Sequence, residues 1–109
     1  MAQRVDTFTI ASGGTTSNTI DMNGRAPVKW SIPVMTGTSI AIQEKNEAGD
    51  FVAVYDDSET ALTLTGAAAA RIKKTQPGTF TLSGEIRLVS NGTEAAERKI
   101  YCYSDSFVD

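Results

Sequence analysis

The sequence predicts an all-β fold: a single antiparallel β-sandwich or jelly roll of about eight to nine short strands. Three observations support this prediction. Apolar residues alternate with polar residues along many short stretches, which is the pattern of half-buried strands. Turn-forming residues separate these stretches at intervals of about 8–12 residues. The 109 residues are enough for one modest core, so we expect a single domain over residues 1–109.

The predicted strands share one phase, in which apolar residues face the core and mostly polar residues face outward. In chain order, the residues expected to face inward are Phe8, Ile10, Ile20, Met22, Val28, Trp30, Ile32, Val34, Ile40, Ile42, Leu62, Leu64, Phe80, Leu82, Ile86, Leu88, Ile100 and Cys102. Trp30 lies in the middle of its stretch, so we expect it in the core rather than exposed as a platform for sugars. Pro33 cannot donate to a strand ladder, which indicates an edge strand or a bulge.

The connections between these stretches are rich in turn-forming residues. They are Ser12-Gly13-Gly14, Asn23-Gly24, the segment 47–50, Gln76-Pro77-Gly78 and Asn91-Gly92. Asn-Gly supplies the positive φ angles of tight turns, and the sequon that begins at Asn91 is interpreted as such a turn. The segment 93–99 is the one candidate for a helix. Its capping-box position holds Ala96 rather than Glu or Gln, so we expect a loop or a single helical turn.

The stretch Asp56-Asp57-Ser58-Glu59 lies between two predicted strands and raises the question of a cation site. A calcium site needs about six to eight oxygen ligands at a characteristic spacing, and that spacing is absent here. Adjacent carboxylates point to opposite faces of an extended chain, which disfavours the paired carboxylates of a glycosidase. Because Asp and Ser are favoured in turns, we interpret this stretch as a connection.

The composition argues against catalysis. The chain contains no histidine, which removes the usual general base near neutral pH and the commonest zinc ligand. The single cysteine, Cys102, follows the buried phase, so we interpret it as a core residue rather than a reactive thiol. We therefore expect no enzyme activity, no catalytic residues, no cofactor and no metal.

The charge of the chain indicates which partners it avoids. The formal net charge is −3 and the sequence pI is about 4.8, so nucleic acid and anionic membranes are poor partners. The N-terminal segment lacks the apolar run of a signal peptide, and we expect synthesis and residence in the cytosol. A small basic cluster, Arg71, Lys73 and Lys74, is either a solvated strand end or a docking site for an acidic partner.

Three aromatic residues near the C-terminus are candidates for an interface. Tyr101 and Tyr103 flank Cys102 in the opposite phase, so we expect both to face outward. Tyrosine gives a large contact area at low entropic cost, although the pair could equally cover a sheet face beneath a loop. We expect a short N-terminal arm over residues 1–4 and a loose tail over 104–109, and we expect the arm or the tail around Phe107 to contact a partner.

The order of patterns over residues 8–66 resembles that of small structural proteins from tailed bacteriophages. The matching patterns are a strand at 8–10, a Gly/Thr/Ser turn at 13–17, an I-D-M strand at 20–22, an apolar strand with a proline at 30–35, F-x-x-V-Y-D at 51–56 and T-L-T at 63–65. The later part of the chain matches only in its strand order.

By this resemblance the chain is similar to capsid decoration, or cement, proteins, which are β domains that bind the outside of an assembled head. The resemblance implies a virion protein on the capsid surface, assembled in the host cytoplasm, with the major capsid protein as its partner and a homo-oligomer on the shell. Two other functions stay open: a tail or fibre component of the virion, and a carbohydrate-binding or adhesin-like module.

Overall fold

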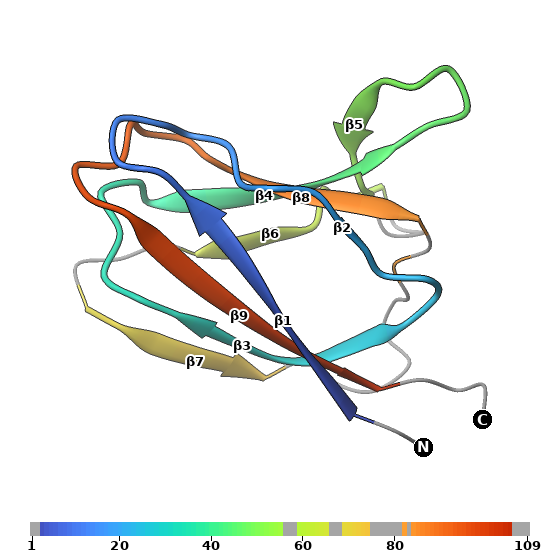
Figure 1. Cartoon of the computed structure of the whole chain (residues 1–109), viewed down its shortest axis with the longest axis horizontal. Coiled ribbons are helices and arrows are strands. Elements are labelled where there is room, and N and C mark those ends of the chain that lie inside the picture. The colour runs from blue at the N-terminus through green and yellow to red at the C-terminus, as the bar shows by residue number, and fades with distance from the viewer. Residues whose placement is uncertain (1–2, 56–58, 66–68, 75–81, 83, 106–109) are drawn as a thin grey trace.

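Two antiparallel β-sheets packed face to face form the fold (Figure 1). The computed structural model describes residues 3–55, 59–65, 69–74, 82 and 84–105. Those residues form β1 (Gln3–Ile10), β2 (Ile20–Asp21), β3 (Ala26–Ile32), β4 (Ser39–Lys45), β5 (Phe51–Ala53), β6 (Thr63–Thr65), β7 (Arg71–Lys74), β8 (Glu85–Ser90) and β9 (Arg98–Asp105). The predicted all-β sandwich is therefore confirmed. None of the described residues forms a helix long and apolar enough to cross a membrane.

The strand pairs are nested, as in a long hairpin folded over on itself. One sheet has four strands in the order β1-β9-β3-β7, and the other has the order β2-β8-β4-β5 with β6 also paired to β4. Thus β1 pairs with β9, β2 with β8, β3 with β7 and β4 with β6, while β5 is added beside β4. Nested pairing of this kind is that of a jelly roll, a double-sheet form of the β-sandwich.

The core lies between the two sheets and follows the predicted alternation. Its buried residues are Phe8, Ile10, Met22, Trp30, Ile32, Met35, Ile40, Ile42, Leu64, Leu82, Ile86, Leu88, Ile100 and Cys102. Ile20 and Leu62 are partly buried and pack against this cluster, whereas Phe80 lies outside the described residues. The predictions that Trp30 and Cys102 are core residues are confirmed, since both are fully buried.

Two residues of the predicted inward face depart from it because of the backbone around them. The pairing of β3 with β9 shifts register between Pro27 and Lys29, and this irregularity leaves Val28 only half-buried. β3 ends at Ile32, and Val34 beyond it is 44% exposed. The prediction of an edge strand or bulge at Pro33 is wrong: β3 is a central strand, and Pro33, which cannot donate to a ladder, follows its end.

The connections confirm two further predictions. Asn23 and Gly24 have φ angles of 50° and 75°, and the Arg25 N–H donates to the Met22 carbonyl at 3.0 Å, which makes a tight turn. The segment from residue 93 to the start of β9 at Arg98 is a loop without helix. The positive φ angles of an Asn-Gly pair thus set this turn locally, as the sequence predicts.

Candidate functional site

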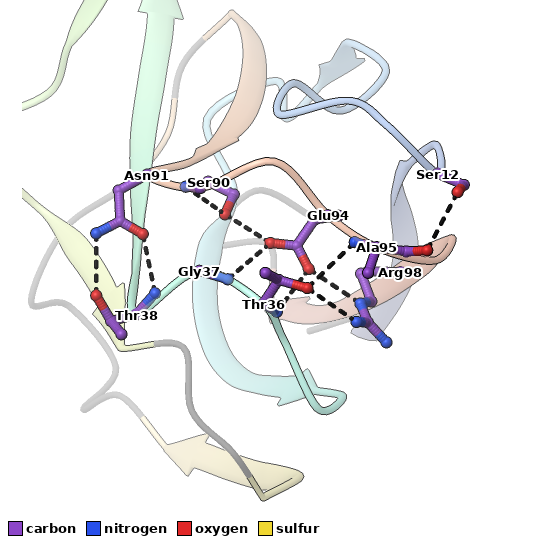
Figure 2. A network of polar contacts seen from close by, with 10 residues as sticks. Ser12, Thr36, Gly37, Thr38, Ser90, Asn91, Glu94, Ala95 and Arg98 are labelled. Carbon is purple, nitrogen blue, oxygen red and sulfur yellow. Dashed lines mark hydrogen bonds and ion pairs between the residues drawn. The ribbon is translucent and has the colours of Figure 1, made fainter.

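The loops at one end of the sandwich meet around a buried carboxylate, Glu94 (Figure 2). Glu94 lies in the β8–β9 loop and is fully buried. Its Oε1 accepts hydrogen bonds from the Thr36 N–H at 2.8 Å and from Arg98 Nε at 2.9 Å. Its Oε2 accepts from the Gly37 N–H at 2.9 Å and from Ser90 Oγ at 2.8 Å. Each oxygen of the carboxylate therefore has two donors, and the β3–β4 loop is tied to the β8–β9 loop.

A third loop joins the same cluster through its backbone. The Gly13 N–H donates to the Glu94 carbonyl at 2.8 Å, and the Glu94 N–H donates to the Gly14 carbonyl at 2.9 Å. Ser12 Oγ donates to the Ala95 carbonyl at 3.3 Å. Figure 1 shows the β1–β2, β3–β4 and β8–β9 loops gathered at the left end of the sandwich. We call the contacts of Glu94 with these loops the Glu94 network.

The surroundings of Glu94 fix its protonation state. Burial alone would raise the pKa of this carboxyl, but the hydrogen bonds from Thr36, Gly37, Ser90 and Arg98 outweigh burial and lower the pKa to about 2. At neutral pH the group is a fully hydrogen-bonded carboxylate, which suits it to holding loops rather than to exchanging protons. Glu94 was not predicted from the sequence; the signal that the sequence offers is its spacing of four residues from Arg98.

Asn91 holds the β3–β4 loop from the other side. Its Oδ1 accepts hydrogen bonds from the Thr38 N–H at 2.9 Å and from the Ser39 N–H at 3.2 Å. Its Nδ2 donates to Thr38 Oγ1 at 3.0 Å (Figure 2). Asn91 therefore connects the two loops through its side chain. The predicted tight turn with positive φ angles is not formed here, because the chain only bends at Asn91 and Gly92 and neither residue has a positive φ.

Gly37 provides a test of how tightly the Glu94 network is packed. A Cβ atom on Gly37 would lie 2.1 Å from Ser90 Oγ and 2.8 Å from Asn91 Oδ1. We expect Gly37→Ala to push Ser90 away from Glu94 and to lower the free energy of unfolding, measured in urea, by about 2 kcal/mol. Gly92→Ala is the matched control, because its Cβ would come no closer than 3.4 Å to a neighbour. Equal losses in the two variants would contradict the packing described here.

The acidic stretch and the cysteine do not assemble a reactive site within the described residues. Tyr55 pairs with Ala61, and Glu59 is exposed with a φ of 62°, so this region is a connection between strands; residues 56–58 lie outside the described residues. Burial and the nearby Asp6 raise the pKa of the Cys102 thiol to about 12. The thiol is therefore protonated and buried at neutral pH, which agrees with its interpretation as a core residue.

The surface of the four-stranded sheet that points away from the core carries both predicted interface tyrosines. Its residues alternate with buried residues along β1, β9 and β3, and β7 supplies their register partners. We call this set the outer face: Gln3, Val5, Thr7, Thr9, Lys29, Ser31, Ile72, Lys74, Lys99, Tyr101, Tyr103 and Asp105. The prediction that Tyr101 and Tyr103 face outward is thereby confirmed.

The register of the strands brings these side chains into rows across the whole sheet. One row is Val5, Tyr103, Lys29 and Lys74, and the next is Thr7, Tyr101, Ser31 and Ile72. Side chains directly opposite each other on neighbouring antiparallel strands are in reach of contact. Residues from four distant segments of the chain therefore form one continuous surface.

The outer face combines exposed apolar groups with positive charge. Ile72 is 61% exposed, Val5 50% and Tyr101 37%. Tyr103 is half-buried, and Lys29 Nζ lies 4.0 Å from its ring centroid. An exposed group of large apolar side chains on one face of a protein indicates an interaction site.

The charge of the outer face is opposite to that of the chain. Three lysines, Lys29, Lys74 and Lys99, belong to it against one acidic residue, Asp105 at the end of β9, whereas the chain has a formal net charge of −3. Lys99 Nζ is 3.9 Å from a carboxylate oxygen of Glu97, a distant and exposed pair that neutralises little. Such separation of charge favours a partner with an acidic surface.

An open groove of about 530 Å³ lies beside Tyr101. Ile32, Pro33 and Ile72 contribute apolar walls, and Arg71 and Lys99 contribute cations. The groove adjoins the outer face, with which it shares Ser31, Ile72, Lys99 and Tyr101. It brings Arg71, from the predicted basic cluster, beside Tyr101, one of the predicted interface tyrosines.

The remaining predicted contact residues belong to the predicted N-terminal arm and tail. The prediction of a loose tail is wrong for Ser104 and Asp105, which are the last residues of β9. Phe107 is outside the described residues. Gln3 and Arg4, assigned from the sequence to an N-terminal arm, are the first residues of β1. Comparisons of the chain with protein-family models, with curated proteins and with solved structures found no match.

Proposed function

We propose that this chain is a structural protein of a bacteriophage virion that binds the outer surface of the capsid and stabilises the head. The outer face is the observation that carries the proposal, because it is an exposed, apolar and basic surface on a β-sheet. Residues 8–66 also resemble capsid decoration proteins, which suggests the major capsid protein as the partner. In this proposal the chain acts in the virion, after assembly in the host cytoplasm.

The construction of the sandwich suits a binding protein that acts mechanically. Val5, Tyr101 and Ile72 sit on paired strands, so little backbone entropy is lost when they are covered. A protein that binds only the assembled shell stabilises that state by mass action. Many identical copies on one shell, each binding weakly, would together resist its disruption.

The direct test adds the purified chain to undecorated heads of the phage that encodes it. We expect the chain to co-sediment with the heads to saturation and to raise the temperature at which the heads break open. Imaging of the decorated heads would locate the bound copies. Heads that bind no chain, or that break at an unchanged temperature, would contradict the proposal, and binding confined to the tail would favour a tail component.

A carbohydrate-binding function is the second candidate, because Tyr101 is an exposed aromatic ring beside a groove. Two observations make it the weaker one. Trp30 is buried, and the cation of Lys29 lies over the ring of Tyr103, where a sugar would stack. Glycan-array binding that is lost in Tyr101→Ser would favour this function over capsid binding.

A further inference from the structure

We infer that the groove beside Tyr101 binds an acidic segment of a partner protein, in which an apolar side chain is flanked by carboxylates. The inference deepens the proposed function and rests on it, since it gives the chemistry of the partner at the capsid-binding face. The apolar side chain would enter the groove, and the carboxylates would contact the cations beside it.

The walls of the groove indicate that the partner inserts an apolar side chain. Ile32 and Pro33 line it from β3 and the residue that follows, and Ile72 lines it from β7. Ile72 is 61% exposed, which is a high exposure for a large aliphatic side chain in a strand. An inserted apolar side chain would remove Ile72 and the ring of Tyr101 from water, which is favourable.

The arrangement of cations around these walls indicates that the partner segment is acidic. Arg71 and Lys99 line the groove itself, and Lys74 and Lys29 stand opposite each other on the neighbouring strands. Arginine presents a planar fork of donors that matches a carboxylate, so Arg71 suits a carboxylate contact. Carboxylates on both sides of an apolar anchor would therefore find a cation on either side of the groove.

Other occupants of the same surface are disfavoured by charge. A second copy bound symmetrically through the outer face would gather Lys29, Lys74 and Lys99 of both copies in one interface, where like charges repel. A long polyanion such as nucleic acid would extend beyond this face and be repelled by the rest of the chain, whose net charge is −3. A short acidic segment avoids both difficulties.

The test titrates the isotope-labelled chain with a short synthetic peptide of glutamates around a central phenylalanine. We expect shifts of the backbone amide signals of Ile72, Lys99 and Tyr101 at peptide concentrations of about 5 mM, with a dissociation constant of about 1 mM. Peptides with a central serine, or with lysines in place of glutamates, should bind at least about tenfold more weakly. Raising NaCl from about 50 to about 300 mM should also weaken binding.

Surface variants connect the binding to the groove. Three substitutions should each weaken binding of the peptide by about tenfold: Lys99→Glu, Arg71→Glu and Ile72→Ser. The matched controls on the other sheet are Lys45→Glu, whose side chain is 41% exposed, and Val52→Ser, at a residue that is 46% exposed, and these should bind as the parent does. Shifts that map elsewhere, equal binding of acidic and basic peptides, or no shift at all would overturn the inference.

The same variants separate this inference from the proposed function. Heads that bind Arg71→Glu and Lys99→Glu as well as the parent would leave capsid binding standing and overturn the groove as its site. Heads that bind no form of the chain, while the peptide binds as expected, would overturn capsid binding and keep the groove as a site for acidic segments. Concentration-dependent dimers that are lost in Ile72→Ser would instead assign the face to a second copy.

Discussion

Replacing Glu94 with glutamine is expected to lower the free energy of unfolding by about 3–5 kcal/mol at neutral pH. The amide keeps the shape of the side chain but loses the charge that pairs with Arg98 at 2.9 Å. It also places an NH₂ group where one oxygen of the carboxylate accepted two donors, so a buried donor is left unpaired whichever oxygen is replaced. Urea unfolding followed by the fluorescence of Trp30, the single tryptophan, measures this loss.

Glu97→Gln is the matched control for this substitution. Glu97 lies in the same loop, its side chain is 59% exposed and its contact with Lys99 is 3.9 Å long. Such an exposed pair contributes little, so we expect a change of less than about 0.5 kcal/mol. If the two variants unfold at the same urea concentration, Glu94 does not hold the loops as described.

The pH dependence of stability gives a second signature of Glu94. Its pKa is about 2 in the folded chain against an ordinary value of 4.5, so the unfolded state takes up the proton first as pH falls. The stabilisation is thus complete above about pH 4.5 and is lost progressively as pH falls toward 2, by about 3 kcal/mol in total. The glutamine of the variant has no group that titrates in this range. The difference in free energy of unfolding between the parent and Glu94→Gln should therefore shrink as pH falls from about 4.5 toward 2. A difference in free energy of unfolding that stays constant with pH would mean that the charge of Glu94 does not contribute to stability.

The fold was predictable because its signals are local. Alternation around Phe8 and Ile10, and around Ile86 and Leu88, depends only on the period of two along a strand. The Asn23-Gly24 turn likewise depends on the φ angles that two neighbouring residues adopt. Such features need no knowledge of which strands pair.

The site was predictable only in part, because it depends on pairing between distant segments. The outward direction of Tyr101 and Tyr103 follows from the phase of β9 alone. The outer face requires the register that puts Val5 beside Tyr103 and Ile72 beside Ser31, which no local pattern gives. The register shift that leaves Val28 half-buried is a property of the β3–β9 pair for the same reason.

Glu94 was missed for a related reason. In the segment 93–99 it is one of two glutamates, and the local feature that separates it from the exposed Glu97 is its spacing of four residues from Arg98, which by itself predicts no burial. Its donors Thr36 and Gly37 come from a loop more than fifty residues earlier in the chain. A buried charge of this kind becomes recognisable only when the loops that surround it are placed together.

Trp30→Ala is expected to lower the free energy of unfolding by about 3–5 kcal/mol, which would leave the domain close to unfolding. Trp30 is fully buried and is the largest side chain of the core, and its ring centroid lies 6.1 Å from that of Phe8. The substitution removes this contact and leaves a cavity between the sheets. Urea unfolding followed by far-UV circular dichroism gives the loss without needing the tryptophan.

Trp30→Phe distinguishes the contribution of ring packing to stability from the contribution of the indole nitrogen Nε1. Among the described residues, Trp30 Nε1 is a buried nitrogen without a hydrogen-bond partner, and phenylalanine removes it while keeping a ring against Phe8. The lost volume destabilises and the removed donor stabilises, so we expect a net loss of only about 1–2 kcal/mol. Thiol labelling of Cys102, the register partner of Trp30, is the second readout, because its rate follows opening of the same core. A phenylalanine variant as unstable as the alanine variant would mean that Nε1 has a partner after all and that the indole is held by it.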